Sequence, residues 1–188
     1  LEVIKRDMSK ILITGASGFI GKRLVISLLE EGHEVYAFVR RKGNLENLKL
    51  KYIVGDLQNP DALKNIPLDI DVAYYLMHSM SDIMSDLQAL AEKVALNFVD
   101  ALKKTAVKQI VYLSGITHDL NLSKHLKSRL SVENILRESG ISLTVLRASI
   151  IIGSGSASFE IIRDLVEKLP VMVAPKWISN KCQPIAVR

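Results

Sequence analysis

The sequence predicts an α/β protein built on a doubly wound parallel β-sheet that is flanked by helices. Apolar segments of strand length alternate with longer amphipathic segments along most of the 188 residues, as they do in βαβ units. Several apolar segments, such as residues 110–113, are continuous, which is typical of strands covered on both faces. We therefore expect one main domain around a parallel sheet.

The expected elements follow the chain in alternating order. Strands are predicted near residues 10–14, 34–39, 51–54, 72–76, 109–114 and 142–147. Helices are predicted near residues 18–31, 61–65, 81–104, 124–139 and 158–168. Gly32 and Gly140 stand where two of these helices must stop, because glycine commonly follows the last helical residue.

The domain limits are expected to follow this pattern. Residues 8–170 are predicted to form the sheet domain, and residues 171–188 the start of a truncated C-terminal substrate-binding part. This tail holds Trp177 and Cys182 and shows no clear periodicity. Met8 has the character of a natural start, so residues 1–7 are interpreted as an extension without a functional role.

Composition excludes several kinds of partner. The formal charge is +5, but lysines and arginines are scattered, apart from a cluster at residues 40–42, so we expect no nucleic-acid partner. No segment approaches the roughly 18 apolar residues of a membrane span. The single cysteine, Cys182, excludes an internal disulfide and a multi-cysteine metal site. We expect a cytoplasmic protein without a metal.

A glycine-rich segment follows the first predicted strand and opens the first helix. Gly15 permits a tight turn, Gly18 lets the backbone approach a pyrophosphate, and Gly21 lets helix and strand pack closely. The free N–H groups and the dipole of the helix start favour such an anion. The alternative is a strand-to-helix turn that binds nothing. The dinucleotide-binding residues predicted here are Gly15, Ser17, Gly18, Phe19, Ile20 and Gly21.

The spacing Gly-x-x-Gly-x-x-Gly, with Thr14 before it and Phe19-Ile20 within it, resembles the extended and atypical short-chain dehydrogenase/reductase superfamily. The resemblance covers nearly the whole chain. It implies a Rossmann fold with a seven-strand sheet, a small C-terminal substrate-binding part, and an NAD(P) cofactor. It also implies that the helices at residues 81–104 and 124–139 form a dimer interface.

The second and third strands end on residues that suggest which dinucleotide binds. NAD sites usually carry a carboxylate after the second strand, whereas this strand is followed by Arg40 and Arg41, which can pair with a 2′-phosphate. We therefore expect NADP, with NAD as the alternative; a solvated basic loop after the strand is the other explanation of the arginines. Asp56 and Leu57 end the third strand and, by the resemblance, contact adenine, although Asp56 could simply cap a turn.

The fourth and fifth strands end at the same sheet edge. His78 and Ser79 follow the fourth strand and are predicted to line the nicotinamide-ribose pocket, or else to cap the next helix. Ser114 ends the fifth strand and matches the superfamily's catalytic serine, which also contacts the cofactor.

The next helix lacks the Tyr-x-x-x-Lys pair of typical members and has His125 and Arg129 in its place. These residues are four apart and share one helical face. His125 could exchange a proton near neutral pH, with Arg129 as the fixed charge. The alternative is an ordinary polar helix residue without chemistry.

Residues 75–80 together with residues 125–129 resemble an atypical group related to the NADPH-binding subunit of respiratory complex I and to NmrA-like regulators. Members of that group keep the glycine turn and lack the active-site tyrosine. Residues 147–153, which begin at the last residue of the sixth strand, resemble the segment that lines the nicotinamide side. Ile150 and Ile151 would form an apolar wall there, or a buried strand edge.

Three functions compete on this evidence. The first is an NADP(H)-binding oxidoreductase or epimerase that acts on a small carbonyl or hydroxyl substrate through Ser114, His125 and Arg129. The second is a non-catalytic NADP(H) sensor or structural subunit that acts through a protein partner or as a homodimer. The third, a nucleic-acid-binding module, has only the net charge in its favour.

Overall fold

The computed structural model describes residues 8–43, 49–77, 87–116, 122–169 and 183–187. Contacts group the chain into two compact units, residues 1–146 and 147–188. The first unit contains almost all of the central sheet and is described first. The domain limits predicted from the sequence, 8–170 and 171–188, stay predictions.

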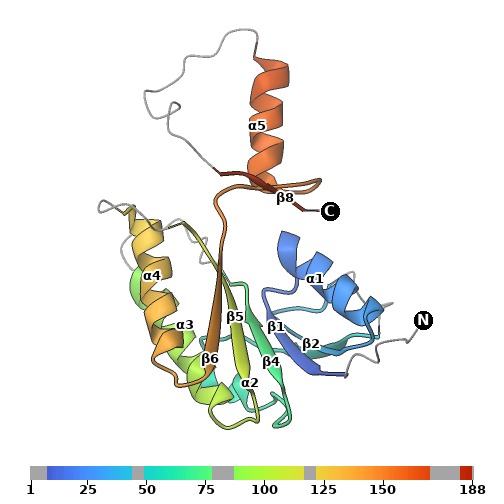
Figure 1. Ribbon diagram of the computed structural model, residues 1–188, viewed down its shortest axis with the longest axis vertical. Coiled ribbons are helices and arrows are strands. Elements are labelled where there is room, and N and C mark those ends of the chain that lie inside the picture. Colours follow the sequence, from blue (N-terminus) through green and yellow to red (C-terminus); the bar gives the residue numbers. More distant parts are fainter. Residues whose placement is uncertain (1–7, 44–48, 78–86, 117–121, 170–182, 188) are drawn as a thin grey trace, which may run out of the picture. The chain divides into compact units, whose positions relative to one another are not determined.

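The central sheet has six strands in the order β3-β2-β1-β4-β5-β6 (Figure 1). Neighbours from β3 to β5 pair in parallel, with Leu12 opposite both Tyr36 and Ala73. The predicted doubly wound parallel sheet is therefore confirmed, and β4 ends one residue before its expected limit. The strands are β1 (Lys10–Thr14), β2 (Glu34–Val39), β3 (Lys51–Val54), β4 (Val72–Tyr75), β5 (Gln109–Ser114) and β6 (Ser142–Arg147).

Within the described part of the chain, five helices connect or follow these strands, and the sequence explains where several of them start and stop. Gly32 and Gly140 follow α1 and α4 with φ angles of +86° and +81°, a region that glycine enters without a steric penalty. The Ser123 hydroxyl accepts a hydrogen bond from Leu126 N at the start of α4. The helices are α1 (Phe19–Glu30), α2 (Pro60–Leu63), α3 (Leu87–Leu102), α4 (Lys124–Arg137) and α5 (Ala157–Lys168).

Alternate residues of β1 belong to two different hydrophobic clusters. Ile11 and Ile13 pack in one cluster with Val25 of α1. Leu12 packs in the other with Phe98 of α3 and with residues of α2 and α4. Because successive side chains of a strand point to opposite faces, helices cover both faces of the sheet. Figure 1 shows α1 on one side of the strands and α3 with α4 on the other.

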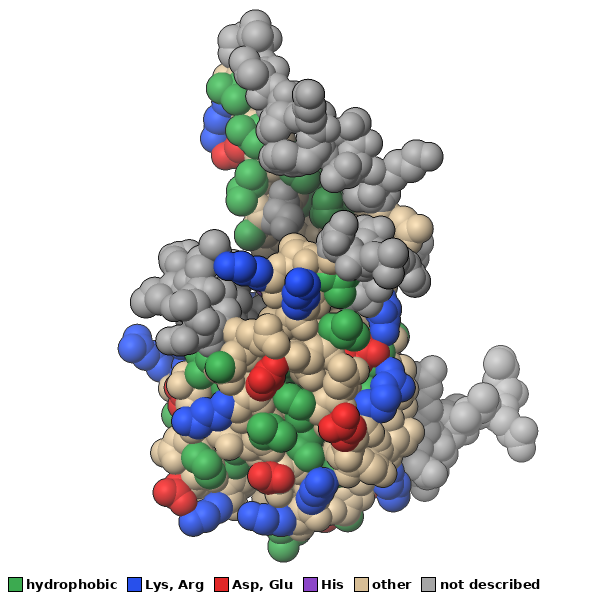
Figure 2. Space-filling model, turned by 90° about the vertical axis from the view of Figure 1, so that its left-hand side faces the viewer, with side chains coloured by type: hydrophobic (Ala, Val, Ile, Leu, Met, Phe, Trp, Pro, Cys, Tyr) green, Lys and Arg blue, Asp and Glu red, His purple; other side chains and the backbone are tan. Residues whose placement is uncertain are grey.

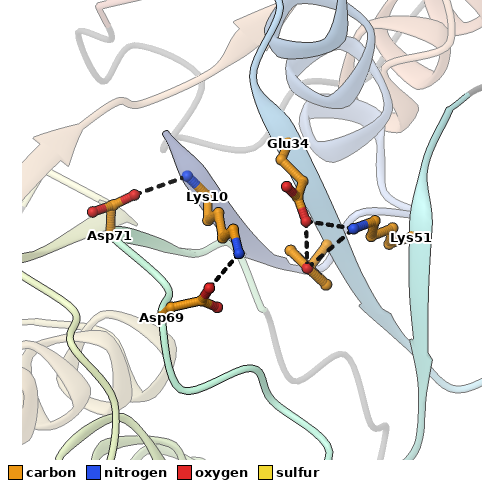
Figure 3. A network of polar contacts seen from close by, with 6 residues as sticks. Lys10, Glu34, Lys51, Asp69 and Asp71 are labelled. Atoms are coloured by element: carbon orange, nitrogen blue, oxygen red, sulfur yellow. Dashed lines mark hydrogen bonds and ion pairs between the residues drawn. The ribbon is translucent and has the colours of Figure 1, made fainter. Parts of the chain in front are cut away.

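Charged residues gather where the strands begin (Figure 3). Lys10 at the start of β1 pairs with Asp69, and its backbone N–H donates to Asp71 Oδ2 at 2.9 Å. Glu34 at the start of β2 accepts hydrogen bonds from Lys51 and from the Tyr36 hydroxyl, which hold the pKa of its carboxyl below the ordinary value. These partly exposed ion pairs contribute little stability singly. They lie at the amino edge of the sheet, whereas ligands of open α/β sheets bind at the opposite, carboxyl edge.

Two short strands in the second unit were not predicted. β7 (Ile151–Ile152) pairs in parallel with β8 (Ile185–Ala186). Two-residue strands carry no periodic signal, so a sequence pattern cannot reveal them. Ile151, expected in a wall beside nicotinamide, takes part in this pairing. Within the described ranges, the structure contains no helix long and apolar enough to cross a membrane.

Candidate functional site

The glycine-rich turn between β1 and α1 is sterically closed to side chains at two positions. Gly15 has a φ of +74°, and a Cβ there would lie 2.8 Å from the Leu76 carbonyl oxygen. A Cβ on Gly21 would lie 2.2 Å from the Gly15 carbonyl oxygen. The buried Thr14 hydroxyl donates to Tyr74 O at 3.1 Å and ties the end of β1 to β4. The strand, the turn and the helix therefore pack so closely that only glycine fits at these two positions, and the turn exposes backbone that could cradle a ligand.

The start of α1 offers N–H groups to a ligand. Gly18 N donates to Gly15 O at 3.0 Å, and the next helical bond runs from Lys22 N to Gly18 O. The N–H groups of Phe19, Ile20 and Gly21 precede that bond, as is usual in the first turn of a helix. Among the described residues no side chain caps α1, and its first turn carries no acidic group. A pyrophosphate fits this cradle in both shape and charge.

The ends of β2 and β3 place the predicted adenosine-side residues at the same edge. Arg40 and Arg41 directly follow β2 and are exposed. Asp56 Oδ1 accepts a hydrogen bond from Gln58 N at 2.9 Å, so Asp56 does cap the turn after β3. Leu57 is buried, and its carbonyl oxygen accepts from Asn97 Nδ2 of α3 at 2.9 Å. The Asp56 carboxylate is exposed while it accepts this hydrogen bond.

The end of β4 packs against the glycine turn. Leu76 N donates to Thr14 O at 3.3 Å, and Leu76 lies against Gly15. His78 and Ser79, predicted for the nicotinamide-ribose pocket, lie outside the described residues.

Ser114 ends β5 with a buried hydroxyl. The residue is 1% exposed, and no described residue gives its Oγ a hydrogen bond. Burial raises the pKa of the neighbouring Tyr112 hydroxyl, and the Ser114 hydroxyl lowers it by a smaller amount. The geometry between the two hydroxyls is not that of a hydrogen bond. Buried hydroxyls nearly always find a partner, so an unpaired one at a ligand-facing edge is a functional candidate.

The first half of α4 is fastened to the end of β5. Tyr112 Oη donates to Arg129 O at 3.2 Å, and Arg129 Nη1 donates to Leu113 O at 3.3 Å. A Cβ on Gly115 would lie 2.7 Å from Leu126 Cδ2, so helix and strand approach closely. Sequence reasoning missed Tyr112 and Gly115; a glycine directly after the predicted serine was the only available signal.

The predicted His125 and Arg129 are brought together by this packing. Arg129 Nε donates to His125 Nε2 at 3.1 Å, across one helical turn. Burial and the Arg129 charge both lower the pKa of His125, with burial the larger cause. Both effects favour the neutral form of the imidazole. Arg147 is the last residue of β6, and it belongs to the second unit, as does Ile150.

Comparison with known proteins agrees with this geometry. A family model described as NAD(P)H-binding matches residues 15–167. The chain is 31% identical over 123 residues to a 3-beta-hydroxysteroid dehydrogenase of Mycolicibacterium neoaurum, covering 60% of this chain and 33% of that protein. It is 28% identical over 145 residues to the photosystem II assembly factor Ycf39 of Cyanophora paradoxa, covering 73% and 44%. The chain spans less than half of the length of these two relatives.

Solved structures share the fold. A short-chain dehydrogenase/reductase superfamily protein from Agrobacterium tumefaciens with bound NAD superposes with a TM-score of 0.70 at 19% identity, covering 84% of this chain and 58% of that one. A UDP-glucuronic acid 4-epimerase from Bacillus cereus, in complex with UDP-glucuronic acid and NAD, gives 0.67 at 24% identity, covering 84% and 63%. At these identities the likeness shows a common fold.

Proposed function

The chain belongs to the NAD(P)H-binding family, and from this premise we propose that its first unit binds NADP(H) along the carboxyl edge of the sheet. The observation that carries the proposal is the glycine cradle, which is closed to side chains at Gly15 and Gly21 and uncapped at Gly18. The pyrophosphate would lie on the N–H groups at the start of α1. A nicotinamide dinucleotide, when bound, supplies hydride transfer.

The choice of NADP over NAD depends on the end of β2. Arg40, Arg41 and Lys42 stand there, with no carboxylate to accept from ribose hydroxyls or to repel a 2′-phosphate. Exposed guanidinium groups can pair bidentately with phosphate. On the face drawn in Figure 2, Lys and Arg side chains are interspersed with Asp and Glu, which suits a local phosphate contact better than a long polyanion.

Arg40→Ala is expected to weaken NADPH binding by about 10-fold or more and to leave NADH binding nearly unchanged, because a charge-assisted hydrogen bond contributes about 1.5–3 kcal/mol. Isothermal titration with both nucleotides measures this. Lys108→Ala is the matched control, since it removes an exposed positive charge at the amino edge. Equal losses for NADPH and NADH would remove Arg40 from the 2′-phosphate site.

We further propose that catalysis, where it occurs, uses Ser114, His125 and Arg129. Ser114 would orient a carbonyl or hydroxyl oxygen of the substrate. His125 would form a hydrogen bond with the same part of the substrate, and Arg129 would hold His125 in place. Several relatives are named as dehydrogenases or reductases, which supports a small oxygen-bearing substrate. Asp56, Leu57, His78 and Ser79 complete the proposed cofactor contacts.

A non-catalytic role is the second candidate, and the absence of the Tyr-x-x-x-Lys pair, which His125 and Arg129 replace, favours it. The likeness to an assembly factor supports the same role. Oxidation of NADPH with a panel of aldehydes and ketones, lost in Ser114→Ala, separates an enzyme from a sensor. A homodimer through α3 and α4, a protein partner and a cytoplasmic location stay predictions.

A further inference from the structure

The hydrogen bond between Arg129 and His125 fixes which imidazole nitrogen carries the proton. Every polar hydrogen of a guanidinium is a donor, and the group has no acceptor. Arg129 Nε lies 3.1 Å from His125 Nε2, so Nε2 must present its lone pair to take part in the bond. A neutral imidazole with a lone pair on Nε2 carries its proton on Nδ1.

The position of the arginine is set by the strand and not by the histidine. Arg129 Nη1 donates to Leu113 O at 3.3 Å, and the Arg129 carbonyl oxygen accepts from Tyr112 Oη at 3.2 Å. Leu126, on the same turn of α4, packs where Gly115 leaves room. The guanidinium is therefore held by β5, and His125 adapts to it.

We propose that Arg129 is a positioning residue that holds His125 as the Nδ1–H tautomer, which leaves Nδ1–H as a donor for an oxygen acceptor of the ligand. The acceptor would be a carbonyl or hydroxyl oxygen on the substrate or on the nicotinamide side of the cofactor. This ligand assignment rests on the proposed function, whereas the tautomer does not.

The proposal changes the role expected for His125. A protonated imidazole would turn Nε2–H toward Arg129 Nε–H, so two donors would face each other and the hydrogen bond would be lost. His125 therefore acts by donating a hydrogen bond in its neutral form, and Arg129 does not stabilise an imidazolium.

The test is the nitrogen-15 NMR spectrum of the imidazole rings in the ligand-free 188-residue chain at neutral pH. We expect His125 to show a protonated Nδ1 and an unprotonated Nε2. His33 is the internal control, because its Nδ1 accepts from Ser9 N at 3.2 Å and must therefore show the opposite tautomer. His125→Asn identifies the His125 signals. An Nε2–H tautomer, or an imidazolium, at His125 would overturn the proposal.

Arg129→Met tests whether the arginine is the cause. This variant keeps an unbranched side chain and removes every donor, so His125 is expected to move toward the Nε2–H tautomer that free histidine prefers in water. Lys127→Met, on an exposed position of the same helix, should leave the tautomer unchanged. An unaltered His33 signal shows that the fold is intact. Retention of Nδ1–H in folded Arg129→Met would contradict the assignment to Arg129.

The two proposals fail separately. The NMR measurement uses ligand-free protein, so its result is independent of nucleotide binding. A chain that shows the Nδ1–H tautomer and binds no NADP(H) would contradict the proposed function and the ligand assignment, and would leave the role of Arg129 in positioning His125 supported.

Discussion

Gly18→Asp is expected to leave the protein folded and to lower its affinity for NADPH and NADH by at least about 100-fold, or 2.7 kcal/mol. Gly18 is the N-cap of α1, with φ −75° and ψ 173°, and aspartate is among the preferred residues at such a position. Among the described residues, a Cβ there would meet only the Gly15 carbonyl oxygen, at 3.2 Å. The new carboxylate would accept hydrogen bonds from the N–H groups that otherwise bind the pyrophosphate, and its negative charge would repel the pyrophosphate.

Isothermal titration gives the affinities, and thermal unfolding checks the fold. Gly18→Asn is the matched control, because asparagine has the same shape without the charge and also caps helices. We expect it to lose less affinity than Gly18→Asp. Nucleotide binding by Gly18→Asp equal to that of the unmodified chain would show that the start of α1 does not hold the pyrophosphate.

Gly21→Ala is expected to destabilise the fold by about 2–4 kcal/mol, at or above the upper part of the usual range for overpacking. The added Cβ would lie 2.2 Å from the Gly15 carbonyl oxygen and 2.7 Å from Ala16 Cα. Both obstacles are backbone atoms, so the helix must shift away from the turn. Urea denaturation measures the change in the free energy of unfolding.

Gly43→Ala serves as its control, since among the described residues a Cβ on Gly43 meets nothing within 4 Å. Its free energy of unfolding should stay within about 0.5 kcal/mol of the unmodified value. If Gly21→Ala were as stable as Gly43→Ala, the close approach of α1 to the turn would be wrong.

Much of the first unit follows from local sequence. β1, β2, β3 and β5 have the predicted limits, because buried strands read as short apolar runs between turn residues. The glycine turn could also be predicted from local sequence, because the spacing of its glycines is a steric requirement of the turn. Gly15 and Gly21 meet this requirement.

The rest depends on contacts between distant residues. The hydrogen bonds that fasten Arg129 to Leu113 and Tyr112 join residues 16 and 17 positions apart, and no spacing rule reveals them. The helical period predicted that His125 and Arg129 share one face of the helix, and Arg129 Nε does lie 3.1 Å from His125 Nε2. The proposed tautomer of His125 depends on the direction of the Arg129 Nε–H donor, which the helical period does not reveal.

The most direct test of NADP(H) binding is isothermal titration of the unmodified 188-residue chain with NADPH and with NADH. We expect saturable binding of both nucleotides, with NADPH tighter by about 10-fold or more, as a 2′-phosphate contact would give. Failure of the folded chain to bind either nucleotide would contradict the proposal that the glycine cradle holds a dinucleotide.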